Sequence, residues 1–413
     1  MHATTHIAAD NNRFVFAADD PPASEVGAAI NPYYLADETA IMAQLMDIAR
    51  VGEDRAEKIR ETATMLVESV RRNRGKSGGL DAFMSQYDLS SQEGVVLMCL
   101  AEALLRVPDA DTADRLIADK INAGDWEGHR GTSESPFVNA STWGLMLTGR
   151  IVKIDPETLE NPSGFMRKLV TRAGEPVIRG AMRQAMRIMG HQFVMGRTIA
   201  EAMKRSQAGE NAKYRYTFDM LGEAALTEPD SRRYFEAYCE GIGAIGAARP
   251  AGVSIHGAPS ISVKLSALFP RYEYAQRARV LNTLAPMLRE LAVRSKEADI
   301  GITVDAEEMD RLEIALELFE QVYRDPALDG WEGFGLAIQT YHKRALAQTR
   351  WLINLAREVG REIPVRLVKG AYWDSEIKRA QEQGLSTYPV FTRKPNTDVC
   401  YLACARELLD ARP

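Results

Sequence analysis

The pattern of apolar residues changes character once along the chain. Over residues 37–106, apolar side chains such as Ile41 and Leu45 recur at helix spacing, which predicts amphipathic helices. Residues 1–36 lack that pattern and contain a Pro-Pro pair, so we expect a disordered or extended lead there. No strand pattern appears before residue 214, and a helical region is predicted over residues 37–206.

Beyond residue 214, short β-branched runs alternate with amphipathic helices. The predicted strands cover residues 216–221, 261–266, 301–306, 335–339 and 365–369. The predicted helices cover residues 229–247, 275–297, 309–323, 343–359, 374–383 and 397–411. Crossovers of this length predict a parallel sheet. No Gly-x-Gly-x-x-Gly sequence opens a helix after a strand, which disfavours a dinucleotide-binding fold.

The predicted fold class is therefore α/β. An N-terminal all-helical region leads into an incomplete (β/α)8 TIM-like barrel over residues 207–413, with about five of the eight strands.

Composition and charge narrow the function classes. With 51 Lys and Arg against 57 Asp and Glu, the formal net charge of −6 argues against a dedicated nucleic-acid binder. There is no secretory signal and no apolar run of about 18 residues, so we expect a cytoplasmic protein. The four cysteines and six histidines have no metal-ligand spacing, and no metal site is expected.

Polar side chains end four consecutive predicted strands. Lys264 ends the second strand, Asp305 the third, Gln339 the fourth and Lys369 the fifth. The C-terminal ends of barrel strands carry the working residues, and a buried polar group must be paired or functional. We expect Lys264 and Asp305 either to pair with each other or to meet a charged substrate.

The same strand ends offer aromatic and cationic groups. A lysine, a carboxylate and an aromatic wall suit a small zwitterionic substrate, and Tyr372 and Trp373 can pack against a flat ring. Arg366, Lys369 and the loop 392–394 supply positive charge for a phosphate-bearing cofactor.

These residues lie in motifs that resemble the proline dehydrogenase region of proline utilization A (PutA), truncated within the barrel. The barrel motifs are Phe-Asp-Met-Leu-Gly-Glu-Ala at 218–224, Lys-Leu-Ser-Ala-Leu at 264–268, Asp-Ala-Glu-Glu at 305–308, Arg-Leu-Val-Lys-Gly-Ala-Tyr-Trp at 366–373 and Phe-Thr-Arg-Lys at 391–394. Two further motifs lie at 90–94 and 137–145. They follow the family's order, and the resemblance covers residues 40–413.

The resemblance implies FAD at the C-terminal mouth of the barrel. Arg366 would approach the reactive edge of the flavin, and Gln339 would contact the flavin ring. The rest of the cofactor would be held by Val368, Lys369, Gly370, Trp373, Thr392 and Lys394.

The resemblance also implies the substrate, L-proline. Lys264 would face its carboxylate, Asp305 would lie between substrate and barrel, and Tyr372 would wall the proline ring. Hydride transfer to the flavin would give pyrroline-5-carboxylate, and the electrons would pass to a membrane quinone. That acceptor implies peripheral contact with the inner membrane surface, and self-association is left open.

The chain departs from the family pattern in three ways. The last three barrel strands are missing, together with the helix whose arginine pair clamps the proline carboxylate. The aldehyde dehydrogenase half of a bifunctional member is missing too. Residues 1–36 show no ribbon–helix–helix pattern, so no DNA partner is expected. We therefore expect an incomplete, poorly active fragment.

Two other functions remain open on the sequence alone. One is an aldolase-like barrel enzyme that uses Lys264 or Lys369 as a Schiff-base nucleophile. The other is a non-catalytic fragment with a helix-mediated role in association.

Overall fold

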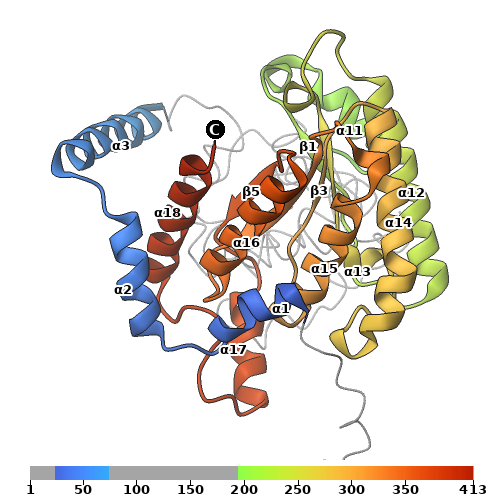
Figure 1. The fold of residues 1–413 in the computed structure, drawn as a ribbon. Coiled ribbons are helices and arrows are strands. Elements are labelled where there is room, and N and C mark those ends of the chain that lie inside the picture. The colour runs from blue at the N-terminus through green and yellow to red at the C-terminus, as the bar shows by residue number, and fades with distance from the viewer. Residues whose placement is uncertain (1–23, 74–193, 413) are drawn as a thin grey trace, which may run out of the picture. The chain divides into compact units, whose positions relative to one another are not determined.

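A computed structural model describes residues 24–73 and 194–412 of the chain (Figure 1). These residues belong to two compact units. One unit holds residues 24–51 and 207–412, and the other holds residues 52–73 and 194–206. The described helices of the second unit are α3 (Glu53–Asn73) and α11 (Ile199–Ser206), while every described strand belongs to the first.

The first unit is built on a parallel five-stranded sheet in the order β1-β2-β3-β4-β5. The strands are β1 (Thr217–Asp219), β2 (Ser260–Val263), β3 (Ile302–Val304), β4 (Phe334–Gln339) and β5 (Val365–Val368). Val263 is in register with Val304, and Gln339 with Val368. Because each strand pairs with the next one in sequence, the sheet winds in one direction, as in a (β/α) barrel.

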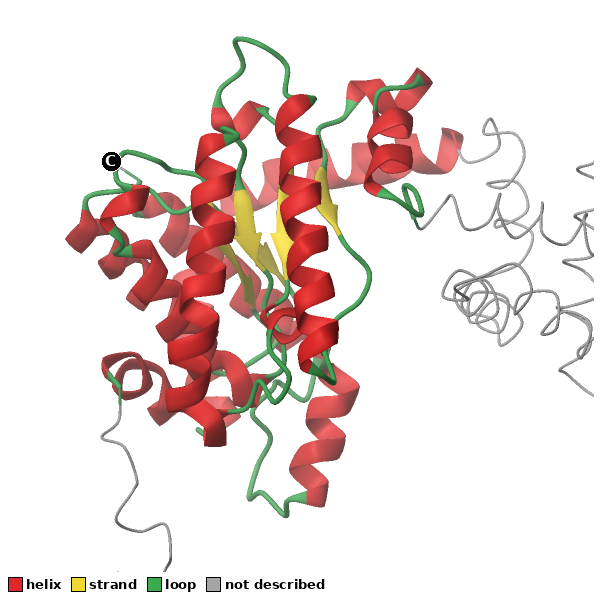
Figure 2. Ribbon diagram, turned by 90° about the vertical axis from the view of Figure 1, so that its right-hand side faces the viewer, coloured by secondary structure: helices red, strands yellow, loops and turns green. Residues whose placement is uncertain are grey.

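Helices connect and cover these strands (Figure 2). The helices that follow β1 are α12 (Glu228–Ala247), α13 (Leu265–Leu268), α14 (Arg277–Glu297), α15 (Leu312–Tyr323), α16 (Ala345–Val359), α17 (Trp373–Glu382) and α18 (Lys394–Asp410). Short 3-10 turns are η2 (Asn31–Tyr33), η3 (Gly209–Lys213), η4 (Ile255–Gly257), η5 (Tyr274–Gln276), η6 (Met309–Arg311) and η7 (Pro326–Leu328). None of the helices in the described ranges carries an apolar stretch long enough to cross a bilayer.

The predicted partial barrel is confirmed. All five predicted strands and all six predicted helices after residue 214 are present, with ends that differ by a few residues. Beyond residue 214, the single-turn helix α13, which follows β2, was not predicted, and its first two residues fall in the predicted strand 261–266. A one-turn helix has too few residues for a periodic pattern to indicate it.

Burial is greatest in β4 and lowest in the edge strands β1 and β5. All six residues of β4 are buried, whereas the four residues of β5 are only partly buried. Among the described residues no strand pairs with the outer side of β1 or β5. Aromatic packing joins β4 to the helix α15 that covers it, since the ring centroids of Phe319 and Phe334 lie 4.7 Å apart in a stacked geometry.

A short helix, α1 (Glu25–Ile30), lies where we expected a disordered or extended lead. Tertiary contacts explain the difference, because Ser24 donates to Glu313 at 2.8 Å and Asn31 donates to the same carboxylate at 2.6 Å. Val26 and Ile30 are buried. Contacts with a residue so distant in sequence leave no local pattern to detect.

The helix α2 (Glu38–Ala49) clusters with the barrel unit and not with the second unit. Its buried residues Ile41 and Leu45 share an apolar cluster with Cys400 and Cys404 of α18. The structure thus divides the chain differently from the predicted helical region over 37–206 and barrel over 207–413. Residues 74–193, most of the predicted helical region, lie outside the described residues.

Replacing Gly27 tests whether α1 is clamped by Glu313. A Cβ atom at Gly27 would lie 2.3 Å from a carboxylate oxygen of Glu313. Gly27→Ala should therefore lower the free energy of unfolding by about 1–3 kcal/mol. Gly243→Ala in α12 is the control, since nothing lies within 4 Å of a Cβ there, and it should add about 0.5–1 kcal/mol. Urea denaturation measures both, and equal effects would contradict the clamp.

Candidate active site

Charged side chains gather at the C-terminal edge of the sheet. Lys264 Nζ lies 2.9 Å from Asp305 Oδ2 and 3.1 Å from Asp219 Oδ1. Arg366 Nη1 donates to the other oxygen of Asp305 at 2.8 Å, and its Nη2 donates to Ser262 Oγ at 2.9 Å. Strands β1, β2, β3 and β5 therefore contribute one continuous charge chain: Asp219, Lys264, Asp305 and Arg366.

The charge chain fixes the protonation state of its lysine. Burial lowers the pKa of Lys264, but the carboxylates of Asp305 and Asp219 outweigh burial and raise that pKa above its usual value. The side chains of Lys264 and Asp305 are only 15% and 12% exposed. Lys264 is thus held as an ammonium ion at neutral pH.

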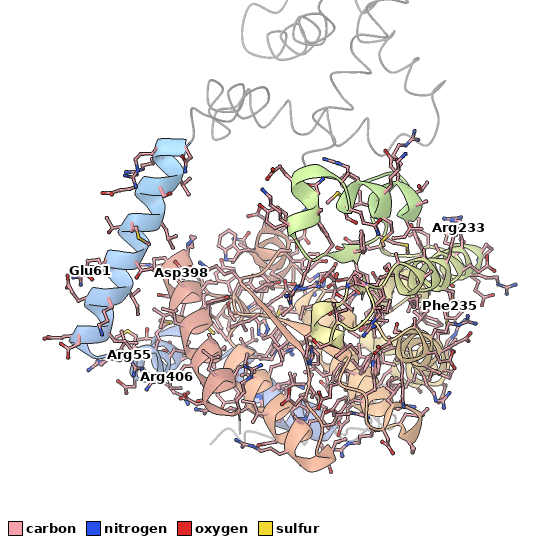
Figure 3. All side chains as sticks on the ribbon, turned by 90° about the horizontal axis from the view of Figure 1, so that it is seen from above. Arg55, Glu61, Arg233, Phe235, Asp398 and Arg406 are labelled. Carbon is pink, nitrogen blue, oxygen red and sulfur yellow. The ribbon has the colours of Figure 1, made fainter. Side chains whose placement is uncertain are left out.

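Lys369 is also held as a cation, but at a different place. A hydrogen bond and ion pair with Asp398 raise the pKa of Lys369. Lys394 bonds to the same carboxylate at 2.9 Å. The cations expected to act together therefore form two groups: Arg366 joins the charge chain, while Lys369 and Lys394 share Asp398. Asp398, which Figure 3 labels, lies near the start of α18.

Gln339 ends β4 with its amide fixed in one orientation. Its Nε2 donates to the carbonyl of Glu307 at 2.9 Å, and its Oε1 accepts from the N–H of Ala371 at 3.0 Å. The side chain is buried. Gln339 therefore ties the loop after β3 to the loop after β5.

The loop after β5 contains a glycine, Gly370, that packs against an aromatic ring. Gly370 has a φ of 139°, and a Cβ atom there would lie 2.4 Å from the ring of Tyr341. Tyr372 packs against the cluster of Tyr341, Met309 and Val390, and burial raises the pKa of its phenol. The carbonyl of Val368 accepts from the N–H of Thr340 at 2.8 Å.

Trp373 and Thr392 join this loop to the start of α18. Trp373 Nε1 donates to the carbonyl of Phe391 at 2.8 Å, and 41% of the tryptophan remains exposed. Thr392 donates its N–H and its hydroxyl to Glu38 of α2. One end of the site therefore combines the exposed ring of Trp373, the backbone of Gly370 and the two lysines Lys369 and Lys394.

Sequence reasoning missed two carboxylates of the site. Asp219 ends β1, and the rule that found Lys264 and Asp305 would have found it had the first strand been included. Glu307 is buried, accepts from the N–H of Ser266 at 3.0 Å and from Arg311, and burial raises its pKa. Glu307 holds the turn that follows Lys264, and its place in Asp-Ala-Glu-Glu was the available signal.

Three family models match the chain. The model "Proline dehydrogenase" matches residues 202–413, and "Proline utilization A proline dehydrogenase N-terminal domain" matches residues 24–71. The model "DNA-binding domain of Proline dehydrogenase" matches residues 79–193, which lie outside the described residues.

Individual relatives agree with these matches. The bifunctional protein PutA of Salmonella typhimurium is 48% identical over 397 residues, which are 95% of this chain and 30% of that protein. Proline dehydrogenase 1 of Bacillus subtilis is 27% identical over 190 residues, 46% of this chain and 54% of that protein. A crystal structure of a proline utilization A variant from Bradyrhizobium japonicum superposes with a TM-score of 0.68 at 46% identity, covering 95% of this chain and 38% of that one.

The chain spans about 30% of the length of the bifunctional relatives it matches. The resemblance seen in the motifs is confirmed, because the "Proline dehydrogenase" model covers more than half of the chain, including every strand of the sheet and the whole charge chain. The chain belongs to the proline dehydrogenase family.

Proposed function

We propose that the chain carries the site of FAD-dependent oxidation of L-proline to pyrroline-5-carboxylate, with electrons passed to a quinone at the membrane surface. The observation that carries this proposal is the charge chain at the strand ends of a proline dehydrogenase barrel. Because the proposed acceptor is a membrane quinone, the proposal includes peripheral contact with the membrane. It also includes self-association of the chain.

The charge chain suits a zwitterionic substrate. Lys264 is held as an ammonium ion, which favours binding of the proline carboxylate. Asp305 keeps Lys264 and Arg366 at fixed places on its two oxygens. Tyr372, with a neutral phenol and a half-buried ring, would wall the pyrrolidine ring. Lys264, Asp305 and Tyr372 are thus the proposed catalytic residues.

The loop after β5 fits a flavin nucleotide. Gly370, whose missing Cβ makes room for the ring of Tyr341, is a proposed backbone contact of the cofactor, and Trp373 offers an exposed aromatic face. Lys369 and Lys394 supply charge for phosphate groups. When bound, FAD would accept a hydride from the carbon beside the proline nitrogen. Its other proposed contacts are Gln339, Arg366, Val368 and Thr392.

The lysine environments argue against a Schiff-base enzyme. A nucleophilic lysine needs a depressed pKa, as desolvation or a nearby cation provides. Carboxylates instead raise the pKa of both Lys264 and Lys369. Neither lysine is prepared for attack on a carbonyl group.

DNA is not among the proposed partners. That proposal rests on the pattern of residues 1–36 and on the net charge of −6. The description of the family model matched at residues 79–193 names DNA binding, so those residues are the place to test it.

Replacing Lys264 tests its substrate role. Lys264→Met should lower kcat/KM for proline at least about 100-fold, yet lower the free energy of unfolding by only about 1–2 kcal/mol, because Arg366 still neutralises Asp305. Because the pKa of Lys264 is raised in the folded protein, protonated Lys264 stabilises the fold. That stabilisation is complete below the pKa of the unfolded protein, about 10.4, and is lost only as pH rises through the pKa of the folded protein. The stability difference should therefore stay constant between about pH 6 and about pH 9.

Lys378→Met is the control, since Lys378 is exposed and, within the described ranges, its ion pair is with its helix neighbour Glu382. Turnover and stability should stay near those of the unsubstituted protein, within about 0.5 kcal/mol. A collapsed melting temperature with normal specific activity of the folded Lys264→Met variant would assign Lys264 a structural role instead.

Replacing Arg366 tests the cofactor assignment. Arg366→Ala removes a cation proposed to meet the flavin, so flavin occupancy should fall or its reduction potential should shift. Absorbance spectra and redox titration measure the two. Arg324→Ala is the control, since Arg324 likewise pairs with carboxylates, those of Glu320 and Glu358, but directly follows α15, whereas Arg366 lies in β5. Unchanged occupancy and potential in Arg366→Ala would remove Arg366 from the cofactor site.

A gel mobility assay tests the absence of a DNA partner. The whole chain, mixed with random duplex DNA at low salt, should form no complex tighter than about 10⁻⁵ M. A retarded band that disappears as salt is raised would contradict the proposal.

A further inference from the structure

A carboxylate from the N-terminal part of the chain holds the start of α18. Glu38, in the first turn of α2, accepts from the N–H of Thr392 at 3.1 Å and from its hydroxyl at 3.0 Å. The amide of Asn396 donates to the same carboxylate at 2.6 Å. These bonds join residues more than 350 positions apart in the sequence.

Glu38 supplies the negative charge that no side chain of the neighbouring described residues provides at the N-terminus of α18. The residue before the helix, Arg393, makes no side-chain capping bond. A negative charge near a helix N-terminus is stabilised by the helix dipole and by free N–H groups. Glu38 is the described side chain that provides that charge beside Thr392.

The segment from Val390 to Lys394 is anchored on three sides. The N–H of Phe391 donates to the carbonyl of Tyr341 at 2.8 Å, and the carbonyl of Phe391 accepts from Trp373. Glu38 fixes the third side through Thr392. Trp373, Thr392 and Lys394 are all proposed cofactor contacts, so Glu38 acts on the part of the segment that carries two of them.

We propose that Glu38 is a positioning residue of the cofactor site, which makes α2 part of that site; the inference rests on the proposed function. Both hydrogen-bond donors of Thr392 are committed to Glu38. Thr392 therefore meets the cofactor only as an acceptor, through its hydroxyl oxygen or its carbonyl. The phosphate groups are left to Lys369 and Lys394, whose ammonium groups both bind the carboxylate of Asp398.

The same helix pair offers a matched control at its far end. Arg406 of α18 donates to the carbonyls of Ile48 and Arg50, at 3.1 Å and 2.8 Å, where α2 ends. Figure 3 labels Arg406 and Asp398 on α18, close to its two ends. Arg406→Gln weakens the packing of α2 on α18 without touching Thr392.

The test is titration of the cofactor-depleted chain with FAD, followed by flavin fluorescence. Glu38→Gln keeps the size of the side chain but removes its charge and one acceptor. Its Kd for FAD should rise about tenfold, the equivalent of one lost charge-assisted hydrogen bond. Arg406→Gln should lower the melting temperature about as much as Glu38→Gln does, but it should change the Kd for FAD less than about threefold. Hydrogen exchange over residues 391–396 should speed up in Glu38→Gln only.

Thr392→Val keeps the proposal decidable if Glu38→Gln is unstable, and where both variants fold they form a double-mutant cycle. Thr392→Val removes the hydroxyl, and if Glu38 acts through Thr392 the two effects on Kd will not multiply. Equal Kd values for Glu38→Gln and the unsubstituted chain, or equal losses in Glu38→Gln and Arg406→Gln, would overturn the positioning role alone. No FAD binding by the unsubstituted chain would overturn the proposed function and this role with it.

Discussion

The arrangement of the strand ends depends on the carboxylate of Asp305. One of its oxygens binds the ammonium of Lys264 and the other binds the guanidinium of Arg366. Without it, two cations from β2 and β5 would face each other across the sheet. At an effective dielectric constant of about 20, a pair 3 Å apart gains roughly 5 kcal/mol, and desolvation removes most of that gain. The carboxylate therefore acts chiefly on geometry, since it sets where both cations point.

The fold was largely predictable because its elements repeat. Five apolar runs and the helices between them carry their own periodicity, and each was recognised from local sequence. The turn of α13 and the helix α1 were not, since α13 is too short for a period and α1 is held by Glu313, almost 300 positions away. Contacts of that kind have no signature in the segment that makes them.

The site was predictable to the level of residue type. Polar residues at strand ends pointed to Lys264, Asp305 and Gln339, and the structure brings Lys264 and Asp305 together. The partners of these side chains were harder to predict from the sequence. Arg366 was grouped with Lys369 as positive charge for a phosphate-bearing cofactor, yet alternate residues of a strand face opposite sides, and the two cations bind different carboxylates. The role of Glu38 could not be predicted from the barrel residues, because Glu38 lies more than 150 positions before the predicted barrel begins at residue 207.

The pairing of α2 with α18 has a consequence for how the chain folds. α2 is made before α18, and the helix that covers its apolar face lies some 350 residues further along. At a synthesis rate of about 5–20 residues per second, α2 waits roughly 20–70 s for its partner. During that time Ile41 and Leu45 have no α18 to pack against, and a contact of such long range forms slowly. Until α18 is made, a nascent chain is therefore open to misassociation through the apolar face of α2.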